Sequence, residues 1–353
     1  MERLGSGVGV GALFNGRAKR FSAKVVRALE HALPDALILV SEDLEQARRQ
    51  ARLLWEASPH LLLSGGGDGA IVQLLNLWRE ESGGAPFPRI GVLKLGTGNA
   101  WARVSKAGAF GDLVKVLPKL PRELPITDYD LVEVERTLCH FAGVGWDAHV
   151  LNDYLRNLDR RSSQLVGSRF ASWLHRGVPG YLYATARLTV PEERRRTRLE
   201  GRPRVRVENL GSPAIRIDAW GVQSVDEQVH EGPATVLFEG PIGVGAVSTT
   251  PEWGFGFKAF PFARARPRRM QLRIYDRPVL DAVRNAVRLW RGTLPSAPGF
   301  HDFLVDHVKL TFSRPLAFQI AGDARGERPD VVLRIAEETA PIVDWQAARE
   351  AAR

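Results

Sequence analysis

The segment from Leu61 to Asn76, LLLSGGGDGAIVQLLN, joins an apolar strand to a helical pattern through a glycine-rich turn. In this turn, Asp68 is surrounded by Gly65, Gly66, Gly67 and Gly69. Glycines let the backbone approach a ligand closely, and the free N–H groups at the start of a helix favour a bound phosphate. An aspartate there would repel phosphate unless it orients Mg²⁺. The turn therefore predicts a phosphate site, and a tight strand-to-helix connection without a ligand is the alternative.

A second turn of the same design follows within Ile90 to Arg103, IGVLKLGTGNAWAR. An apolar strand leads into the turn GTGN, Gly96 to Asn99, and a helix comes next. The N-terminal strand adds a third turn at Asn15 to Lys19, and Ser41 ends the second strand. All four positions lie at carboxyl ends of predicted strands, where open α/β sheets bind their ligands. The two glycine turns can therefore converge on one nucleotide.

Parallel strands that alternate with helices must position these turns. From Gly7 to about Ser105, short apolar runs alternate with helical periodicity, which indicates βα units on a mostly parallel sheet. Four runs are predicted strands: Val8 to Phe14, Ala36 to Val40, His60 to Ser64 and Ile90 to Leu93. A helix is predicted over Phe21 to Leu33, and Ser41 is expected to cap the helix after it.

After about Asp128 the pattern changes to that of a second domain. A helical passage runs intermittently from Asp147 to about Thr189, and the chain beyond Pro191 is arginine-rich and strand-like, which favours antiparallel strands. We predict an N-terminal α/β domain over residues 1–130 and a β-rich domain with a helical insertion over residues 131–323. Residues 324–353 are predicted to be a C-terminal tail, with packing against the first domain as one option.

Length and composition limit the class of protein. The 353 residues, of which 44% are hydrophobic and 25% charged, suffice for two globular domains with cores of their own. The single cysteine, Cys139, excludes an internal disulfide and a cysteine-based zinc site, and it favours a reducing compartment. No apolar run approaches the roughly 20 residues that a membrane-spanning helix needs, and the start has no leader pattern. We therefore expect a cytoplasmic protein.

The two turns resemble the catalytic domain of the diacylglycerol kinase family, which includes bacterial lipid kinases and the sphingosine and ceramide kinases. The family pattern GGDGT, followed by a helix with an asparagine, is matched by Gly66 to Gly69 and Asn76. The pattern GTxNDFAR is matched by Gly96, Thr97, Asn99, Ala102 and Arg103, with Trp101 in the place of Phe. NAD kinases share a GGDG turn, but the GTGN segment at this spacing favours the lipid-kinase branch.

The resemblance extends over nearly the whole chain. Gly143 to Ala148 resembles the family's GxGFDA segment, Pro261 to Ala263 its PxA element, and Phe318 to Asp323 falls where the family has a strand ending in DGE. The resemblance implies a diacylglycerol kinase- or NAD kinase-like α/β domain with a mostly parallel sheet, followed by a β-rich antiparallel sandwich. It also implies an enzyme that uses ATP and Mg²⁺ and transfers the γ-phosphate to a hydroxyl of diacylglycerol or a related lipid.

The resemblance assigns roles to individual residues as well. Asp323, in the place of the Glu of DGE, would accept the proton of the lipid hydroxyl, although a solvated turn aspartate is the alternative. Asp68 would contact the nucleotide and Mg²⁺. Asp147 would lie near the lipid acceptor or, alternatively, cap the helix that follows it. The residues expected at the phosphates or the ribose of the nucleotide are Asn15, Ser41, Gly66, Gly67, Gly69, Gly96, Thr97 and Asn99.

Some residues depart from the family pattern. Ala70 stands where Thr is usual, Ala100 where Asp is usual, and Ala321 replaces the Asp of DGE. These alanines leave open a non-catalytic or weakly active lipid- or nucleotide-binding homologue; an NAD-kinase-like enzyme with a soluble acceptor is a third possibility. In the loop Pro261 to Arg273, PFARARPRRMQLR, no carboxylate remains where bacterial members hold a structural Mg²⁺. We therefore predict no protein-bound metal there, and an arginine, Arg266 by first choice, in place of the cation.

The net charge of +9 favours anionic partners, and arginine supplies most of the 49 positive charges. The arginines concentrate between Arg194 and Arg206 and between Arg264 and Arg273. With the aromatic residues between Trp253 and Phe262, they favour a peripheral anionic membrane surface as a partner besides the lipid substrate. Those aromatic residues are equally candidates for the core. No nucleic-acid partner is expected, because no reading module accompanies the charge, and a homodimer stays open.

Overall fold

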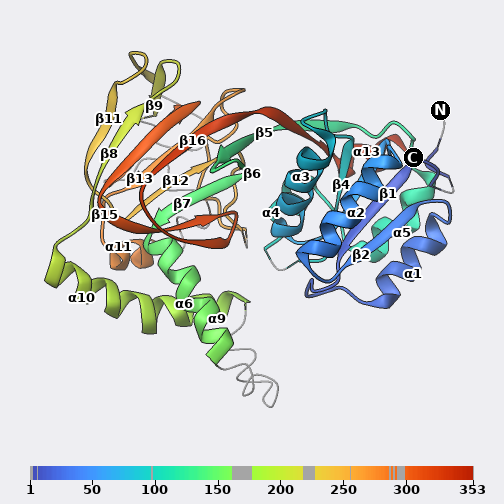
Figure 1. Ribbon diagram of the computed structural model, residues 1–353, viewed down its shortest axis with the longest axis horizontal. Helices are drawn as coiled ribbons and strands as arrows, with labels where there is room; N and C mark the ends of the chain where they lie inside the picture. Colours follow the sequence, from blue (N-terminus) through green and yellow to red (C-terminus); the bar gives the residue numbers. More distant parts are fainter. Residues whose placement is uncertain are drawn as a thin grey trace. The chain divides into compact units, whose positions relative to one another are not determined.

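The computed structural model describes residues 3–5, 7–96, 98–160, 177–217, 227–254, 256–285, 288, 291 and 299–352. The chain divides into two compact units. Residues 1–131, 254–256 and 336–353 form the first unit, and residues 132–253 and 257–335 form the second. Figure 1 shows the helices and strands of both with their labels.

The first unit is an α/β domain with a parallel sheet, as the sequence predicts. Its elements are β1 (Val10–Asn15), α1 (Ala23–Ala32), β2 (Leu37–Ser41), α2 (Leu44–Glu56), β3 (Leu61–Gly66), α3 (Asp68–Ser82), β4 (Arg89–Lys94), α4 (Ala100–Val104), α5 (Phe110–Val116), the 3₁₀ turn η1 (Leu117–Lys119) and α13 (Trp345–Ala351). The strand order is β2, β1, β3, β4, all parallel, and the end of β16 (Asp323–Val343) pairs with β4 in parallel at Ile342.

Burial and capping explain the elements around the first glycine turn. All six residues of β3 are buried, which fits its continuous apolar run. Ala47 and Ala51 of α2 pack against Leu77 of α3 through small side chains. The cap of α2 is Asp43, whose Oδ1 accepts a hydrogen bond from the N–H of Gln46 at 2.8 Å. The expectation that Ser41 caps this helix is therefore wrong, because Ser41 is the last residue of β2.

The second unit consists mainly of strands, with a group of helices between β7 and β8. Its elements are β5 (Ile126–Val134, which begins in the first unit), β6 (Thr137–Cys139), β7 (Phe141–Gly145), α6 (Trp146–Arg160), α9 (Gly177–Ala184), the π-helix η2 (Thr185–Thr189), α10 (Val190–Glu200), β8 (Arg204–Asn209), β9 (Ala214–Ile217), β10 (Glu227–His230), β11 (Val236–Pro241), β12 (Val244–Ser248), β13 (Met270–Tyr275), α11 (Val279–Arg284), β14 (Phe300–Val305), β15 (His307–Ile320) and most of β16.

The strands of the second unit are paired antiparallel. Neighbours follow in the order β10, β9, β14, β13, β12, β7, β15, β16, and β8 pairs with both β15 and β11. Residues 324–343, expected in a tail, continue β16 instead. Residues 191–200, expected to be strand-like, are helical in α10, because Pro191 lies in its first turn and Glu192 pairs with Arg195 and Arg196 at helical spacing.

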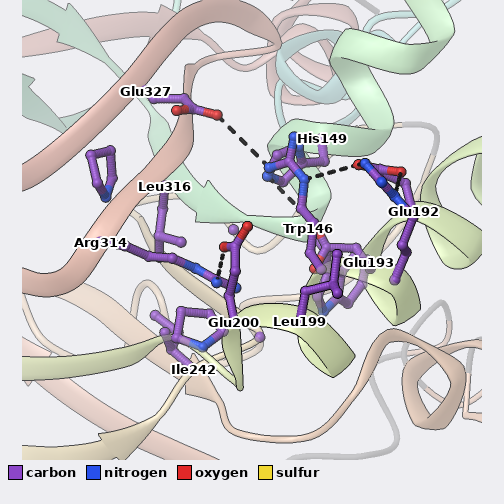
Figure 2. A pocket seen from close by; sticks show the side chains of 16 residues that line it. Trp146, His149, Glu192, Glu193, Leu199, Glu200, Ile242, Arg314, Leu316 and Glu327 are labelled. Carbon is purple, nitrogen blue, oxygen red and sulfur yellow. Dashed lines mark hydrogen bonds and ion pairs between the residues drawn. The ribbon is translucent and has the colours of Figure 1, made fainter.

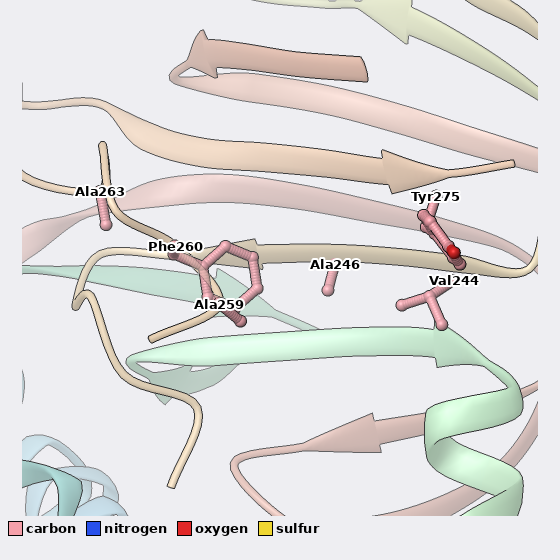
Figure 3. Close-up of a cluster of buried hydrophobic side chains, with 6 residues drawn as sticks. All are labelled: Val244, Ala246, Ala259, Phe260, Ala263 and Tyr275. Atoms are coloured by element: carbon pink, nitrogen blue, oxygen red, sulfur yellow. The ribbon is translucent and has the colours of Figure 1, made fainter. Parts of the chain in front are cut away.

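One core cluster of the second unit holds part of the aromatic segment between β12 and β13. Figure 3 shows Phe260 beside Ala246 and Val244 of β12, with Tyr275 of β13 in the same cluster. Trp253 and Phe257 pack against this cluster half-buried, and Phe262 is buried in a neighbouring one. The core interpretation of these aromatic residues is therefore the one the structure supports, while Phe255 lies outside the described residues.

Candidate functional site

The carboxyl ends of β1, β2 and β3 bring three candidate nucleotide contacts together. Asn15 and Ser41 are in-register neighbours on adjacent strands. Ser41 is buried, and its Oγ donates a hydrogen bond to the carbonyl of Phe14 at 3.3 Å. A Cβ atom placed on Gly66 would lie 3.6 Å from the Cβ atom of Asn15. Asn15, Ser41 and Gly66 therefore lie at one edge of the first unit's sheet.

The first glycine turn needs glycine where the chain is most crowded. A Cβ atom on Gly65 would lie 2.2 Å from the ring of Phe14, and one on Gly66 would lie 2.3 Å from the Cβ atom of Ala70. A Cβ atom on Gly69 would have no neighbour within 4 Å. Helix α3 starts at Asp68, and the first N–H groups of a helix have no acceptor within it. The turn therefore presents a helix N-terminus beside open space, an arrangement that favours an anion.

Asn99 shapes the second glycine turn. Its Oδ1 accepts a hydrogen bond from the N–H of Gly96 at 3.0 Å, and its Nδ2 donates one to the carbonyl of Gly96 at 2.7 Å. Its backbone is left-handed, with φ at 53°, which asparagine tolerates better than most residues. The buried amide of Asn99 is thus engaged within its own turn, whereas the sequence predicts a contact with the nucleotide. Thr97 lies outside the described residues.

Asp68 ties the two glycine turns together. Its Oδ1 accepts a hydrogen bond from the N–H of Trp101, in the first turn of α4, at 3.0 Å. Its other oxygen, Oδ2, would lie 2.7 Å from a Cβ atom on Gly98. The turns themselves touch, because a Cβ atom on Gly96 would lie 2.2 Å from the Cα atom of Gly67. The predicted convergence of the two turns is therefore present within the first unit.

The donor set suits a metal that the nucleotide itself helps to bind. Among the residues that the structure describes, no group of three or more His, Cys, Asp or Glu is arranged to hold a metal ion. Mg²⁺ in nucleotide sites usually takes only one or two carboxylates, together with phosphate oxygens and waters. Oδ2 of Asp68 fits that role, because its partner oxygen alone is used by the hydrogen bond to Trp101.

Asp147, at the start of α6 in the second unit, carries a buried carboxyl group. The residue is 7% exposed, and burial raises the pKa of its carboxyl group to about 7, although hydrogen bonds from Gln319 and from the backbone at Asp147 and Ala148 oppose the shift. Nε2 of Gln319 donates to Oδ2 of Asp147 at 2.6 Å. Oδ1 is buried and has no hydrogen-bond partner of good geometry among the described residues. A hydroxyl or an amine of a ligand is the kind of group that would satisfy it.

Strand register explains the contact between Asp147 and Gln319. Gln319 of β15 lies directly opposite Gly143 of β7. A side chain at Gly143 would lie 2.8 Å from Oδ2 of Asp147, so glycine leaves the space that the carboxyl group occupies. Sequence reasoning missed Gln319. A glutamine inside the apolar run LAFQI is the signal that could have revealed a buried polar partner.

Asp323 begins β16 directly after a two-residue turn. Ile320 and Asp323 are paired across the hairpin, and Ala321 and Gly322 between them have φ values of 50° and 89°. Positive φ at both central residues is the geometry of a type I′ hairpin, which matches the twist of the flanking strands. Asp323 is exposed at the surface, yet desolvation by the neighbouring chain raises the pKa of its carboxyl group, while Arg325 opposes the shift. Asp323 and Asp68 belong to different units.

A cavity of about 450 Å³ lies in the second unit between α10, the start of α6 and β15. Trp146, Ile242 and Leu316 form apolar parts of its wall, as Figure 2 shows. Ion pairs also line it. Nε2 of His149 lies 3.5 Å from Glu193, and Nη1 of Arg196 lies 3.9 Å from Glu327. Burial lowers the pKa of His149 and raises that of Glu193. No local pattern indicates this cavity, because its wall comes from segments that are distant in the sequence.

In the loop Pro261 to Arg273, the last arginine forms a buried ion pair. Nε and Nη2 of Arg273 donate to the two carboxylate oxygens of Asp302 at 2.7 and 2.8 Å, and Nη1 donates to the carbonyl of Ala259 at 2.5 Å. Gln271 donates to Asp302 as well and accepts from the N–H of Phe262. Arg266, the expected replacement for a cation, donates to the carbonyl of Ala265. Arg273 is thus the guanidinium that binds a buried carboxylate here.

Comparisons with known proteins agree with the architecture. Residues 12–134 match the family model of the diacylglycerol kinase catalytic domain. The whole chain is similar in fold to the crystal structure of a diacylglycerol kinase from Bacillus anthracis str. Sterne, with a TM-score of 0.55 at 12% identity, over 96% of this chain and 97% of the other. A second structure from that strain, with a provisional diacylglycerol kinase name, gives a TM-score of 0.59 at 13% identity over 96% and 98%. No curated protein matches the sequence.

Proposed function

Since residues 12–134 carry a diacylglycerol kinase catalytic domain, we propose that the protein is an ATP-dependent lipid kinase that phosphorylates a hydroxyl of diacylglycerol or a related lipid. The observation that carries the proposal is the pair of glycine turns, held together by Asp68 at the carboxyl edge of a parallel sheet. Open α/β sheets bind their ligands at this edge, and a helix N-terminus there favours phosphate. Asn15 and Ser41 lie at the same edge and suit the ribose or a phosphate.

In the proposed transfer, the oxygen of the lipid hydroxyl attacks the γ-phosphorus, the bond to the bridging oxygen breaks, and ADP leaves. Asp323 takes the proton of the hydroxyl as a general base. Desolvation raises the pKa of Asp323 and makes its carboxylate a better proton acceptor than an ordinary surface aspartate. Mg²⁺, held by the phosphates and Oδ2 of Asp68, would neutralise charge on the phosphates. Asp147 and Gln319 would bind the polar head of the lipid through the open acceptor Oδ1 of Asp147.

Two other functions remain as alternatives. Ala70, Ala100 and Ala321 each lack a side-chain oxygen that the family pattern has, which favours a weakly active or non-catalytic homologue that binds lipid or nucleotide. An NAD-kinase-like enzyme with a soluble acceptor is the other alternative. We place the enzyme in the cytoplasm, with peripheral association to anionic membranes and without a nucleic-acid partner. The described residues include no helix that is long and apolar enough to cross a membrane.

The test is transfer of labelled γ-phosphate from ATP to diacylglycerol, to a sphingoid base and to NAD, with the lipids in non-ionic micelles and ATP binding measured separately. Asp323→Asn should lower kcat by about 10²- to 10⁴-fold, the usual contribution of a general base, and leave ATP affinity unchanged. The control is Asp330→Asn on the same strand, where the carboxylate pairs with Lys309 at the surface.

Each outcome separates the candidates. Transfer to a lipid that depends on Asp323 supports the proposal. ATP binding without transfer to any acceptor would establish the binding homologue, and phosphorylation of NAD would establish the third candidate. Full activity in Asp323→Asn would remove Asp323 as the base.

A further inference from the structure

The helices between β7 and β8 expose large apolar side chains to solvent. We call α6, α9, η2 and α10 the helical lobe, because these elements pack on one another within the second unit (Figure 1). Leu199 of α10 is 72% exposed and Leu182 of α9 is 63% exposed, and Leu155 of α6 is exposed too. Among the described residues, Leu199 is the most exposed large hydrophobic side chain. Single exposed leucines are common, but several within one lobe point to a surface that is covered during function.

Arginines without acidic partners accompany these leucines. On α10, Glu193, Arg196 and Glu200 turn towards the second unit, where they pair with His149, Glu327 and Arg314 respectively. Arg194 and Arg198 are spaced i, i+4 on the opposite side of the helix, and both are exposed. Neither one has an acidic partner among the residues that the structure describes. The outward side of α10 therefore presents uncompensated positive charge next to Leu199.

Other arginines of the second unit are neutralised. Arg206 of β8 pairs with Glu208 and Glu239. Arg334 of β16 pairs with Glu133, and Arg269 lies 3.7 Å from Asp306. A high count of arginines in the sequence segment 194–206 is thus a poor guide to the surface charge, because only part of that charge is free to attract an anionic partner. The free part on α10 coincides with an exposed leucine.

We propose that the outward side of α10, with Arg194, Arg198 and Leu199, docks on the surface of an anionic lipid bilayer, with Leu182 of α9 as a second apolar contact. Unpaired guanidinium groups attract anionic head groups, and a neighbouring leucine gains by leaving water for the acyl boundary. This docking surface rests on the proposed function, because a kinase of membrane lipids must reach its substrate at a bilayer. It specifies α10 as the contact, in place of the loop Pro261 to Arg273 and its aromatic neighbours.

The test uses vesicle binding without ATP, so that it does not depend on phosphoryl transfer. Full-length protein is sedimented with vesicles of phosphatidylglycerol and phosphatidylcholine or of phosphatidylcholine alone. Arg194→Glu with Arg198→Glu should weaken binding to the anionic vesicles by about 25-fold or more, from roughly fivefold for each cation removed near the surface. The matched control, Arg206→Glu with Arg334→Glu, changes the net charge equally but should cost less than about threefold, since salt screens distant charges.

A fluorescent label gives a second readout that does not depend on these charge reversals. Cys139 is the only cysteine and is buried, so Leu199→Cys can be labelled selectively with an environment-sensitive dye. The emission of this label should shift to the blue on anionic vesicles. The same label at Val332→Cys, on an exposed position of β16, should keep its emission.

The outcomes are distinguishable from those of the transfer assay. Failure of the wild-type protein to bind anionic vesicles, equal losses in the two charge-reversal variants, or an unshifted label at position 199 would each overturn the docking surface. If vesicles bind as described but no lipid is phosphorylated in micelles, the docking surface stands and the kinase function fails. If lipid is phosphorylated in micelles but vesicles are not bound, the kinase function stands and the docking surface fails.

Discussion

Replacing Asp147 with asparagine should make the protein more stable at neutral and alkaline pH, and we expect the gain to disappear in acid. The carboxyl group of Asp147 is buried, its Oδ1 has no hydrogen-bond partner of good geometry among the described residues, and its pKa is raised to about 7. The ionised group is therefore held where solvation is poor. An asparagine side chain at this position would keep the shape and a hydrogen bond to Gln319 without the charge.

The magnitude follows from the pKa of Asp147. Its folded-state pKa of about 7 exceeds the value of about 3.9 for an unfolded chain by about three units, which corresponds to roughly 4 kcal/mol at 1.36 kcal/mol per unit. Because the folded state holds the proton more tightly, stability is fully present below about pH 4. It falls as the pH rises towards 7, and it stays low above that pH. Between pH 5.5 and pH 8, about half of this effect should be visible, on the order of 2 kcal/mol.

Urea unfolding of the wild type and of Asp147→Asn at both pH values measures the effect. The free energy of unfolding of the variant relative to the wild type should be about 2 kcal/mol larger at pH 8 than at pH 5.5. Asp159→Asn, on an exposed position of the same helix, is the matched control and should show no such change. If the difference between Asp147→Asn and the wild type is equal at the two pH values, the carboxyl group is not held as we argue.

Other substitutions test the glycine turn and the buried ion pair. Gly66→Ala should destabilise the protein by about 1 to 3 kcal/mol in urea unfolding, because its Cβ atom would collide with Ala70. Gly69→Ala should raise stability by up to about 1 kcal/mol and still weaken ATP binding in calorimetry, because its Cβ atom enters the space beside the helix N-terminus; unchanged ATP affinity would move the phosphate elsewhere. Arg273→Met should cost about 3 to 5 kcal/mol, since it leaves the carboxylate of Asp302 buried without its partner. A loss below about 1 kcal/mol would show that the pair is not needed.

The first unit could be predicted because its signals are local. An apolar run followed by glycines and a helical pattern specifies strand, turn and helix in one stretch, as in Leu61 to Asn76. The convergence of the two turns followed from their common place at the carboxyl ends of neighbouring parallel strands. The contact that fastens them, from Asp68 to the N–H of Trp101, is a side-chain bond across 33 residues, and no pattern in the sequence indicates it.

The second unit was harder to predict because its determinants act across long distances. In α10, helical spacing of Glu192 with Arg195 and Arg196 competes with an arginine-rich composition that resembles a strand, and the ion pairs favour the helix. The partner of Asp147 is Gln319, 172 residues away, and only the register of β7 and β15 brings them together. Strand register is set by pairing that a single sequence does not display.

The turn before Asp323 decides how the lost family aspartate should be interpreted. Ala321 and Gly322 both adopt positive φ, so the backbone of the hairpin is retained even though alanine tolerates this region poorly. The position of Asp323 opposite Ile320 depends on that backbone and on strand pairing, and it does not depend on a carboxylate at position 321. Backbone strain of this kind persists where the surrounding structure holds it, often beside functional groups. The replacement by Ala321 therefore removes a charge near the proposed base without displacing the base, which is why we favour catalysis over passive binding.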